Sequence, residues 1–126
     1  MNTVLSRIIL FASDVEQLKL FYQQHFAFTI VEEIPNEWVV LNAGQIEIAF
    51  HRIGEAYRNN SDQAFKIESN TKLVFKIVDD IEQLRSALIE SGVPMTTIKS
   101  YPGFDHLLCD GEDPEGNVFQ LMAAKR

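Results

Sequence analysis

The sequence predicts an α+β fold made of two tandem β-α-β-β-β modules. The segment DVEQLK at positions 14–19 recurs, by identity or close chemistry, as DIEQLR at positions 80–85. Each copy follows an apolar run with the character of a strand, and three further strand candidates follow each copy. Chance can produce one matching hexapeptide, but it does not readily produce the same order of elements as well. The repeat therefore indicates an internal duplication.

Both copies of the hexapeptide are predicted to begin a helix. Asp14 and Asp80 are good N-cap residues, and the acids that follow them suit the positive end of the helix dipole. Gly92 and Pro94 end the second helix. Apolar residues follow each cap at helical spacing, namely Val15, Leu18, Phe21 and Tyr22 in the first helix and Ile81, Leu84 and Leu88 in the second.

Turn residues divide the rest of each half into strands. Pro35-Asn36 is one such turn in the first half, and Pro102-Gly103 is one in the second half. The predicted strands cover residues 28–33, 37–42 and 46–52 in the first half and residues 95–101, 106–109 and 118–122 in the second. The prediction is a single domain of residues 1–126, with a first module at 4–52, a polar linker at 53–70 and a second module at 71–124.

The composition is that of an ordinary globular protein with an acidic balance. A net charge of −7 argues against nucleic acid and anionic membranes as partners, because both require clustered Lys and Arg. No stretch approaches the roughly 20 apolar residues that span a bilayer, and the N-terminal apolar run is too short for a secretory signal. Cys109 is the only cysteine, so no internal disulfide is possible, and it is interpreted as a small buried hydrophobe. We therefore predict a cytoplasmic protein.

The duplicated unit opens at RIILFASD, residues 7–14, carries Phe21-Tyr22 in its helix and closes on DPEGN, residues 113–117. In these features the chain resembles the vicinal oxygen chelate superfamily, which includes glyoxalases, extradiol dioxygenases and the bleomycin- and fosfomycin-resistance proteins. The resemblance covers nearly the whole chain. It implies two modules that curve into a cup-shaped mixed sheet around a small-molecule ligand. It also favours a homodimer, since exposed sheet edges of this kind are often covered by pairing.

In the metal-using members, the resemblance implies four inward metal ligands, usually His or Glu, from the first and the last strand of each module. The matching positions are Arg7 and Glu47 in the first module and Gln120 in the second. For the remaining position, the spacing to the helix gives Leu73, whereas strand alternation gives Lys72. Alternation is the better guide, because it does not bury the second lysine of the same strand.

These residues are poor metal ligands. The guanidinium of Arg7 and the ammonium of Lys72 stay protonated and repel a cation, and the amide of Gln120 is a weak neutral donor. The sequence therefore predicts no standard metal site and no cofactor. Two interpretations of the cations stay open. They form a receptor for an anionic or carbonyl-rich ligand, or Arg7 pairs with Glu47 and closes the cup without any chemistry.

The histidines offer a further possible site. His51 and His106 lie at the ends of predicted strands, where either could act as an acid, a base or a hydrogen-bond donor. With Glu47 they could form a non-standard metal site, although nothing in their spacing requires it. His25 is expected to complement the C-terminal end of the first helix as a cation.

Aromatic and acidic residues complete the set of candidates. Trp38, Tyr101 and Phe104 could supply the aromatic walls of a pocket, or simply pack. Acids near the DPEGN turn are interpreted as solvated loop charges; they are Asp105, Asp110 and Glu112. The candidate ligand-binding residues are therefore Arg7, Trp38, Glu47, His51, Lys72, Tyr101, Phe104, His106 and Gln120.

The leading functional hypothesis is a metal-independent protein that sequesters or recognises a small organic molecule. One alternative is a lyase, isomerase or dioxygenase with an unusual metal set, or with metal-free acid–base chemistry by Glu47 and His51. The other alternative is a non-catalytic interaction module whose cup is filled by its own side chains. The sequence does not identify the ligand.

Overall fold

The computed structural model describes residues 2–54 and 70–125. The chain divides into two compact units, residues 1–65 and 66–126, each with its own sheet and helix. Most of the predicted linker at 53–70 lies outside the described residues. In the described part of the chain, no helix has both the length and the apolar character needed to cross a membrane.

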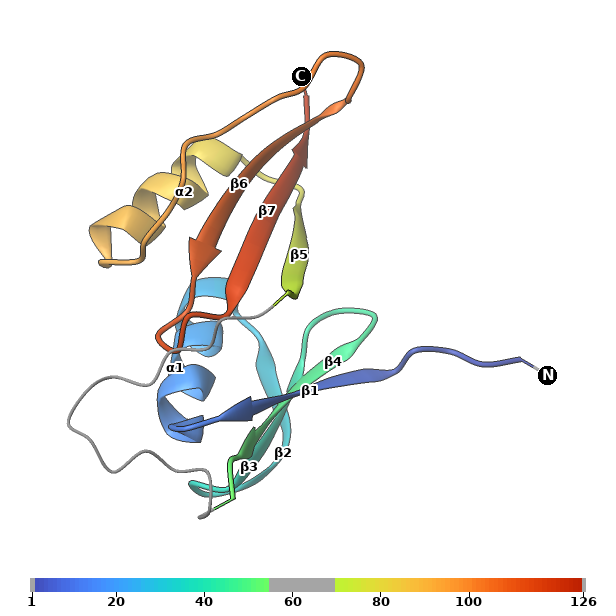
Figure 1. Ribbon diagram of the computed structural model, residues 1–126, viewed down its shortest axis with the longest axis vertical. Coiled ribbons are helices and arrows are strands. Elements are labelled where there is room, and N and C mark those ends of the chain that lie inside the picture. Colours follow the sequence, from blue (N-terminus) through green and yellow to red (C-terminus); the bar gives the residue numbers. More distant parts are fainter. Residues whose placement is uncertain (1, 55–69, 126) are drawn as a thin grey trace. The chain divides into compact units, whose positions relative to one another are not determined.

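The first unit is a four-stranded sheet with a helix on one face (Figure 1). Its elements are β1 (Arg7–Ala12), α1 (Val15–Phe26), β2 (Thr29–Ile34), β3 (Trp38–Asn42) and β4 (Glu47–Arg52). The strand order is β1-β4-β3-β2. β1 runs parallel to β4, and the other neighbouring strands run antiparallel. The predicted strands of this half are therefore confirmed, and most of the strand ends differ from the predicted ones by one residue.

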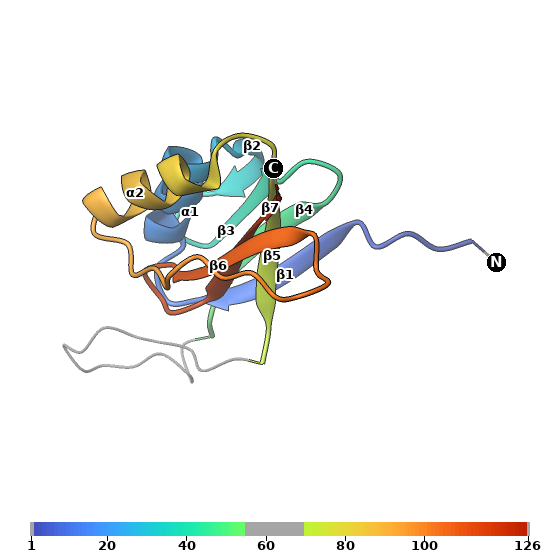
Figure 2. The ribbon, with the colours of Figure 1, turned by 90° about the horizontal axis from the view of Figure 1, so that it is seen from above.

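The second unit repeats this plan with a three-stranded sheet and a helix along one face (Figure 2). Its elements are β5 (Lys72–Ile77), α2 (Ile81–Glu90), β6 (His106–Glu112) and β7 (Val118–Ala124). The strand order is β5-β7-β6, with β5 parallel to β7 and β6 antiparallel to it. In both units the first strand pairs in parallel with the last one, and the helix follows the first strand. The predicted α+β class and the duplication are confirmed.

The predicted strand at residues 95–101 does not form a regular strand. It makes two isolated bridges to β6, at Met95 and at Lys99, and the register shifts by one residue between them. The cause is local, because the backbone N–H of Asp110 donates to the side-chain oxygen of Thr96 at 2.8 Å. In a regular ladder that N–H would donate to a backbone carbonyl. The segment still runs beside β6, where a fourth strand would lie.

Both helices begin at the predicted caps. The carboxylate of Asp14 accepts a hydrogen bond from the backbone N–H of Gln17 at 3.0 Å. The carboxylate of Asp80 accepts from the backbone N–H groups of Glu82 and Gln83, at 2.9 and 3.2 Å. These bonds satisfy N–H groups that have no partner inside the helix. The hexapeptide repeat is thus a repeat of two capped helix starts.

His25 lies in the last turn of α1, as predicted. Its ring packs against Phe21 with a centroid distance of 4.8 Å. Burial lowers the pKa of the His25 imidazole below its usual value, because the charged form loses hydration. Burial therefore favours the neutral imidazole, which weakens the expected interaction of a His25 cation with the end of α1.

Stacked aromatic rings attach α1 to the first sheet. The Tyr22 side chain is fully buried, with its ring centroid 5.4 Å from that of Phe50 on β4 and 6.0 Å from that of Phe28. Burial of each such ring contributes about 1.5–3 kcal/mol relative to an exposed one. Because side chains alternate along a strand, the neighbours of Phe50 in the chain point to the opposite face of the sheet.

The core of the second unit depends on a glycine. A Cβ atom at Gly111 would lie 2.5 Å from the sulfur of Met95 and closer still to the ring of Phe119. The side chains of Phe119 and Leu121 are fully buried on β7, and Cys109 is opposite Leu121 in register. Burial raises the pKa of the Cys109 thiol, so it stays protonated. The interpretation of Cys109 as a small buried hydrophobe is confirmed.

Asp113 organises the DPEGN turn that precedes β7. One oxygen of its buried carboxylate accepts from the backbone N–H groups of Glu115 and Asn117, at 2.9 and 3.0 Å. The other oxygen accepts from the side-chain amide of Asn117 at 2.9 Å. Gly116 adopts a φ of 85°, a value that favours glycine. The turn fixes where β7 begins and therefore where Gln120 stands.

Alternation along β5 decides between Lys72 and Leu73. Leu73 is 6% exposed and pairs in register with the buried Phe119. Lys72 is exposed and shares its face with Val74, which is opposite Gln120 in register. Lys72, and not Leu73, therefore lies on the same face as Gln120, as the alternation argument predicted.

Candidate functional site

Arg7 and Glu47 lie opposite one another on β1 and β4, on the face of the first sheet that points away from α1. Nε and Nη2 of Arg7 both donate to Oε1 of Glu47, at 3.1 and 2.9 Å. Oε1 of Glu32, on β2, lies 3.6 Å from the same Nη2. The Arg7 and Glu47 side chains are about one-third exposed, so solvent screens the ion pair and its net value is about 0–1 kcal/mol. One cation therefore faces two carboxylates.

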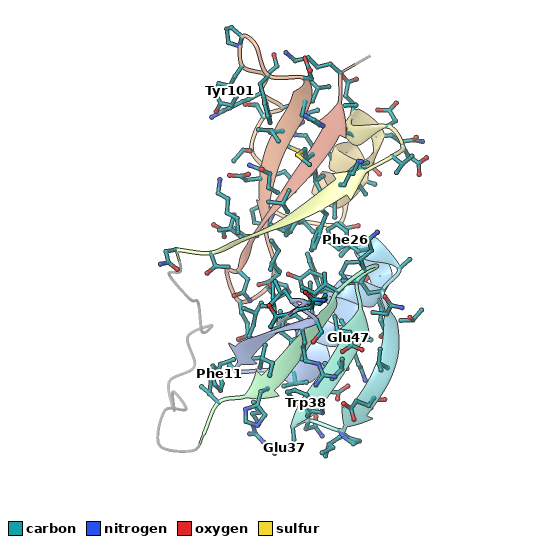
Figure 3. The ribbon with its side chains drawn as sticks, turned by 90° about the vertical axis from the view of Figure 1, so that its right-hand side faces the viewer. Phe11, Phe26, Glu37, Trp38, Glu47 and Tyr101 are labelled. Atoms are coloured by element: carbon teal, nitrogen blue, oxygen red, sulfur yellow. The ribbon has the colours of Figure 1, made fainter. Side chains whose placement is uncertain are left out.

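Aromatic rings extend this face of the first sheet. The guanidinium carbon of Arg7 lies 5.7 Å from the ring centroid of Trp38. The ring of His51 is edge-on to the rings of both Trp38 and Phe11, with centroid distances of 5.8 Å in each case. Figure 3 shows Phe11, Trp38 and Glu47 on the strands of this sheet. The predicted residues Arg7, Trp38, Glu47 and His51 thus share one surface.

A second polar group lies on the sheet of the second unit. Nζ of Lys72 is 2.7 Å from Oδ2 of Asp110, and Nε2 of Gln120 donates to Oδ1 of Asp110 at 3.1 Å. The interpretation of Asp110 and Glu112 as loop charges is wrong, because β6 extends through both residues. Asp110 is opposite Gln120 in register and links it to Lys72.

The neighbouring Asp110 carboxylate explains why position 120 carries an amide and not an acid. The amide nitrogen of Gln120 donates to the Asp110 carboxylate, and a carboxylate at position 120 could not make this hydrogen bond. An acid there would instead place two negative charges about a hydrogen-bond length apart. The Lys72 ammonium, the Asp110 carboxylate and the Gln120 amide therefore form a chain of matched charges and donors.

A comparison with protein families gives a match over most of the chain. The model of the Glyoxalase/Bleomycin resistance protein/Dioxygenase superfamily matches residues 4–121. The protein belongs to this superfamily. The match includes both units, and it confirms the resemblance that the hexapeptide repeat and the DPEGN turn indicated. A comparison with curated proteins gave no significant match.

Solved structures with the same fold include enzymes and resistance proteins. Lactoylglutathione lyase from Agrobacterium tumefaciens is similar with a TM-score of 0.74 and 16% identity, over 97% of this chain and 94% of that one. The fosfomycin resistance protein FosX from Listeria monocytogenes gives a TM-score of 0.75 and 17% identity, over 99% and 96%. A possible glyoxalase from Bacillus cereus gives 0.74 and 14%, over 96% and 99%. At these identities the likeness establishes the fold alone.

The residues at the superfamily's metal positions do not fit a metal ion. Arg7 and Lys72 are cations, and the one carboxylate among the four, Glu47, already accepts two hydrogen bonds from Arg7. Gln120 directs its amide nitrogen, which cannot ligate a metal, toward Asp110. In the described part of the chain, no group of three or more His, Cys, Asp or Glu has an arrangement that could hold an ion.

The possible site of Glu47, His51 and His106 is divided between the units. Glu47 and His51 stand four residues apart on β4, which corresponds to about 13 Å along a strand. His106 belongs to β6 of the second unit. Since Glu47 is also engaged by Arg7, the geometry within the described units does not favour this set as metal ligands.

The remaining predicted residues gather at the start of β6. Tyr101 and Phe104 are exposed and flank a turn in which the Phe104 N–H donates to the Tyr101 carbonyl at 3.0 Å. The Phe104 ring lies 5.3 Å from that of His106, whose Nδ1 is buried without a hydrogen-bond partner among the described residues. His106 is four residues, or about 13 Å, from Asp110 along the strand. These residues are therefore separate from the Lys72 group.

Sequence reasoning missed three residues at these surfaces: Glu32, Asp110 and Phe11. The sequence does contain a signal for Asp110, because strand alternation continued past Cys109 places it on the face of Gln120. Glu32 was harder to assign, since an irregularity between Ile30 and Glu32 shifts the register of β2. Such a bulge reverses which side chains face a given side of the sheet.

Proposed function

We propose that the protein binds a small neutral organic molecule through its carbonyl oxygens, without a transition metal, on the face of the first sheet that points away from α1. The observation that carries this proposal is the Arg7 guanidinium, which stands where metal-using members of the superfamily are expected to hold an ion. Nη1 of Arg7 has no hydrogen-bond partner among the described residues, so it can donate to a carbonyl oxygen. On the second sheet, Lys72 and Gln120 form a separate polar group in which both already donate to Asp110.

The charges favour a neutral carbonyl over an anion. Two carboxylates, Glu32 and Glu47, lie beside the single cation Arg7, so this group carries a net charge of −1. In the second unit, Asp110 balances Lys72. An incoming carboxylate would meet like charges, each costing on the order of 1 kcal/mol at about 4 Å in water and more in a desolvated site. The charges therefore favour a carbonyl-rich ligand over an anionic one.

A titration of EDTA-treated protein tests the proposal. We expect 1,4-cyclohexanedione to shift the NMR signal of the Arg7 side-chain N–H saturably, and 1,4-cyclohexanediol, which lacks carbonyls, to shift it much less. Arg7→Met keeps the aliphatic stem and should weaken binding by about tenfold or more, the scale of a charge-assisted hydrogen bond. Leu20→Ala, at an exposed position of α1, is the matched control and should have no effect. Unchanged binding by Arg7→Met would contradict the proposal.

Metal analysis separates the proposal from the enzyme alternatives. We expect the purified protein to hold well under one equivalent of Zn, Fe, Mn, Co and Ni, because the side chains at the metal positions are cations, an amide and a paired carboxylate. One tightly bound equivalent that disappears in Glu47→Ala would instead support a metal-dependent lyase, isomerase or dioxygenase.

We also propose that the protein is a homodimer in the cytoplasm. The support for pairing is the edge strand β2, all six residues of which are exposed. Unpaired edges present N–H and carbonyl groups that a second chain can cover. The location is supported by composition alone.

A further inference from the structure

Aromatic side chains form a row across the face of the first sheet that points away from α1. Phe11 on β1 is opposite His51 on β4, and His51 is opposite Trp38 on β3. Ile34 continues the row on β2, because it is opposite Trp38. The His51 ring is inclined by 66° to the Phe11 ring and by 72° to the Trp38 ring. We call Phe11, His51 and Trp38 the aromatic row.

Phe11 and the apolar side chains beside the aromatic row are open to solvent, whereas Trp38 is half-buried. Phe11 is 58% exposed, and the adjoining apolar residues Ile34 and Ile9 are 60% and 48% exposed. Scattered apolar side chains on a surface need no explanation, but a contiguous set in register across four strands is typical of a binding surface. The ring faces and edges of the row offer the offset and edge-on contacts that aromatic partners prefer.

A polar group lies next to the aromatic row. Arg7 is two rows away along the same face, yet its guanidinium carbon approaches to 5.7 Å from the Trp38 ring centroid. The Arg7 backbone lies four residues, or about 13 Å, from the aromatic row along β1, and it is the long side chain that brings the guanidinium close to Trp38. A ligand that covers both features therefore needs an aromatic ring and a hydrogen-bond acceptor a few bonds apart. The acceptor must be neutral, because Glu32 and Glu47 already surround Arg7.

We infer that the ligand is an aromatic ketone or a related aryl carbonyl compound, with its ring on the aromatic row and its carbonyl oxygen accepting from Arg7. This inference rests on the proposed function and narrows its ligand class. The choice of a small ligand, and not a second copy of the chain, follows from charge. A symmetric partner would bring the same two carboxylates, with their net charge of −1, against this face.

Four matched probes test the inference on the full chain. They are 4-phenyl-2-butanone, its saturated analogue 4-cyclohexyl-2-butanone, the isosteric anion 3-phenylpropanoate and the corresponding cation 4-phenylbutan-2-amine. Trp38 is the only tryptophan, so its fluorescence reports on this surface directly. We expect the phenyl ketone to bind about two- to tenfold more tightly than the cyclohexyl ketone, because a contact between aromatic rings adds affinity on this scale. We expect both ions to bind less tightly than the phenyl ketone.

Substitutions identify the surface that the probes use. Phe11→Leu keeps an apolar side chain and should remove most of the preference for the phenyl ketone while leaving the cyclohexyl ketone almost unaffected. Leu20→Ala on α1 removes a side chain of similar exposure, 59%, and should change neither. The fluorescence of Trp38 should not depend on protein concentration, since such a dependence would show that a second copy covers the face and would overturn the inference.

The outcomes separate this inference from the proposed function. If both ketones bind equally, and Arg7→Met weakens their binding while Phe11→Leu does not, the aromatic inference fails and the proposed function stands. If binding depends on Phe11 but not on Arg7, the carbonyl contact fails and the aromatic surface stands. Tighter binding of either ion overturns the neutral-carbonyl assignment. Absence of saturable binding by all four probes overturns both ideas.

Discussion

Replacement of Gln120 by an acid is the sharpest test of the charge arrangement in the second unit. Gln120→Glu removes the Nε2 donor that lies 3.1 Å from Oδ1 of Asp110 and puts a carboxylate oxygen in its place. The change is nearly isosteric, so the core packing of β7 should persist. It would also restore a residue type that metal-using members of the superfamily are expected to carry.

The expected loss of stability has two parts. A hydrogen bond to a charged group contributes about 1.5–3 kcal/mol, and the lower end applies because the Asp110 side chain is 28% exposed. Repulsion between carboxylates about 4 Å apart adds roughly 2 kcal/mol at an effective dielectric constant between those of water and a protein surface. Lys72, at 2.7 Å from Asp110, offsets part of this repulsion. The lost hydrogen bond and the remaining repulsion together should lower the free energy of unfolding by about 2–4 kcal/mol at pH 7.5.

The electrostatic part should depend on pH. Like charge raises the pKa of the introduced carboxyl in the folded state above its unfolded value of about 4.3. The folded protein then binds more protons than the unfolded chain at intermediate pH, so the penalty is complete above the raised pKa and is relieved as pH falls through it. The deficit of Gln120→Glu relative to the natural protein should therefore shrink between pH 7.5 and pH 5.

Urea denaturation in the presence of EDTA measures this deficit. The control is Gln120→Met, which loses the hydrogen bond without adding charge and should show a deficit of about 1–2 kcal/mol that is the same at both pH values. Equal deficits for Gln120→Glu and Gln120→Met at pH 7.5 would refute the reasoning, because the introduced charge would then not lie near Asp110.

Three further predictions concern the core, the first helix and the assembly. Gly111→Ala should destabilise the protein by about 1–3 kcal/mol in urea denaturation, because its Cβ would overlap Phe119 and Met95, and a loss below about 0.5 kcal/mol would contradict this packing. Burial lowers the pKa of His25, so the folded protein resists protonation of this side chain. The free energy of unfolding should therefore fall as pH drops through about 6.5. His25→Gln should make the free energy of unfolding depend less on pH between pH 8 and pH 5.5. Sedimentation equilibrium at micromolar concentration should give twice the monomer mass, and a monomer mass would count against the homodimer.

The sequence by itself determined the duplicated plan of the fold. Asp14 and Asp80 start the two helices because an aspartate before an apolar helical period satisfies free N–H groups wherever it occurs. Alternation along one strand placed Lys72 and Leu73 on opposite faces, since side chains of a strand necessarily alternate. The positions that the resemblance assigned to Arg7 and Glu47 already put them on neighbouring strands, but their pairing was one of two interpretations left open.

The tertiary structure alone decided which charges meet. Asp110 reaches Lys72 across the intervening strand β7, and this contact depends on the register of β6 against β7. Glu32 approaches Arg7 only because β2 carries an irregularity that resets its register. Register is set by the packing of whole faces and by turn geometry, and a shift of one residue moves every side chain to the other face. No pattern within a single strand contains that information, which is why the balance of charge on each sheet could be read only from the fold.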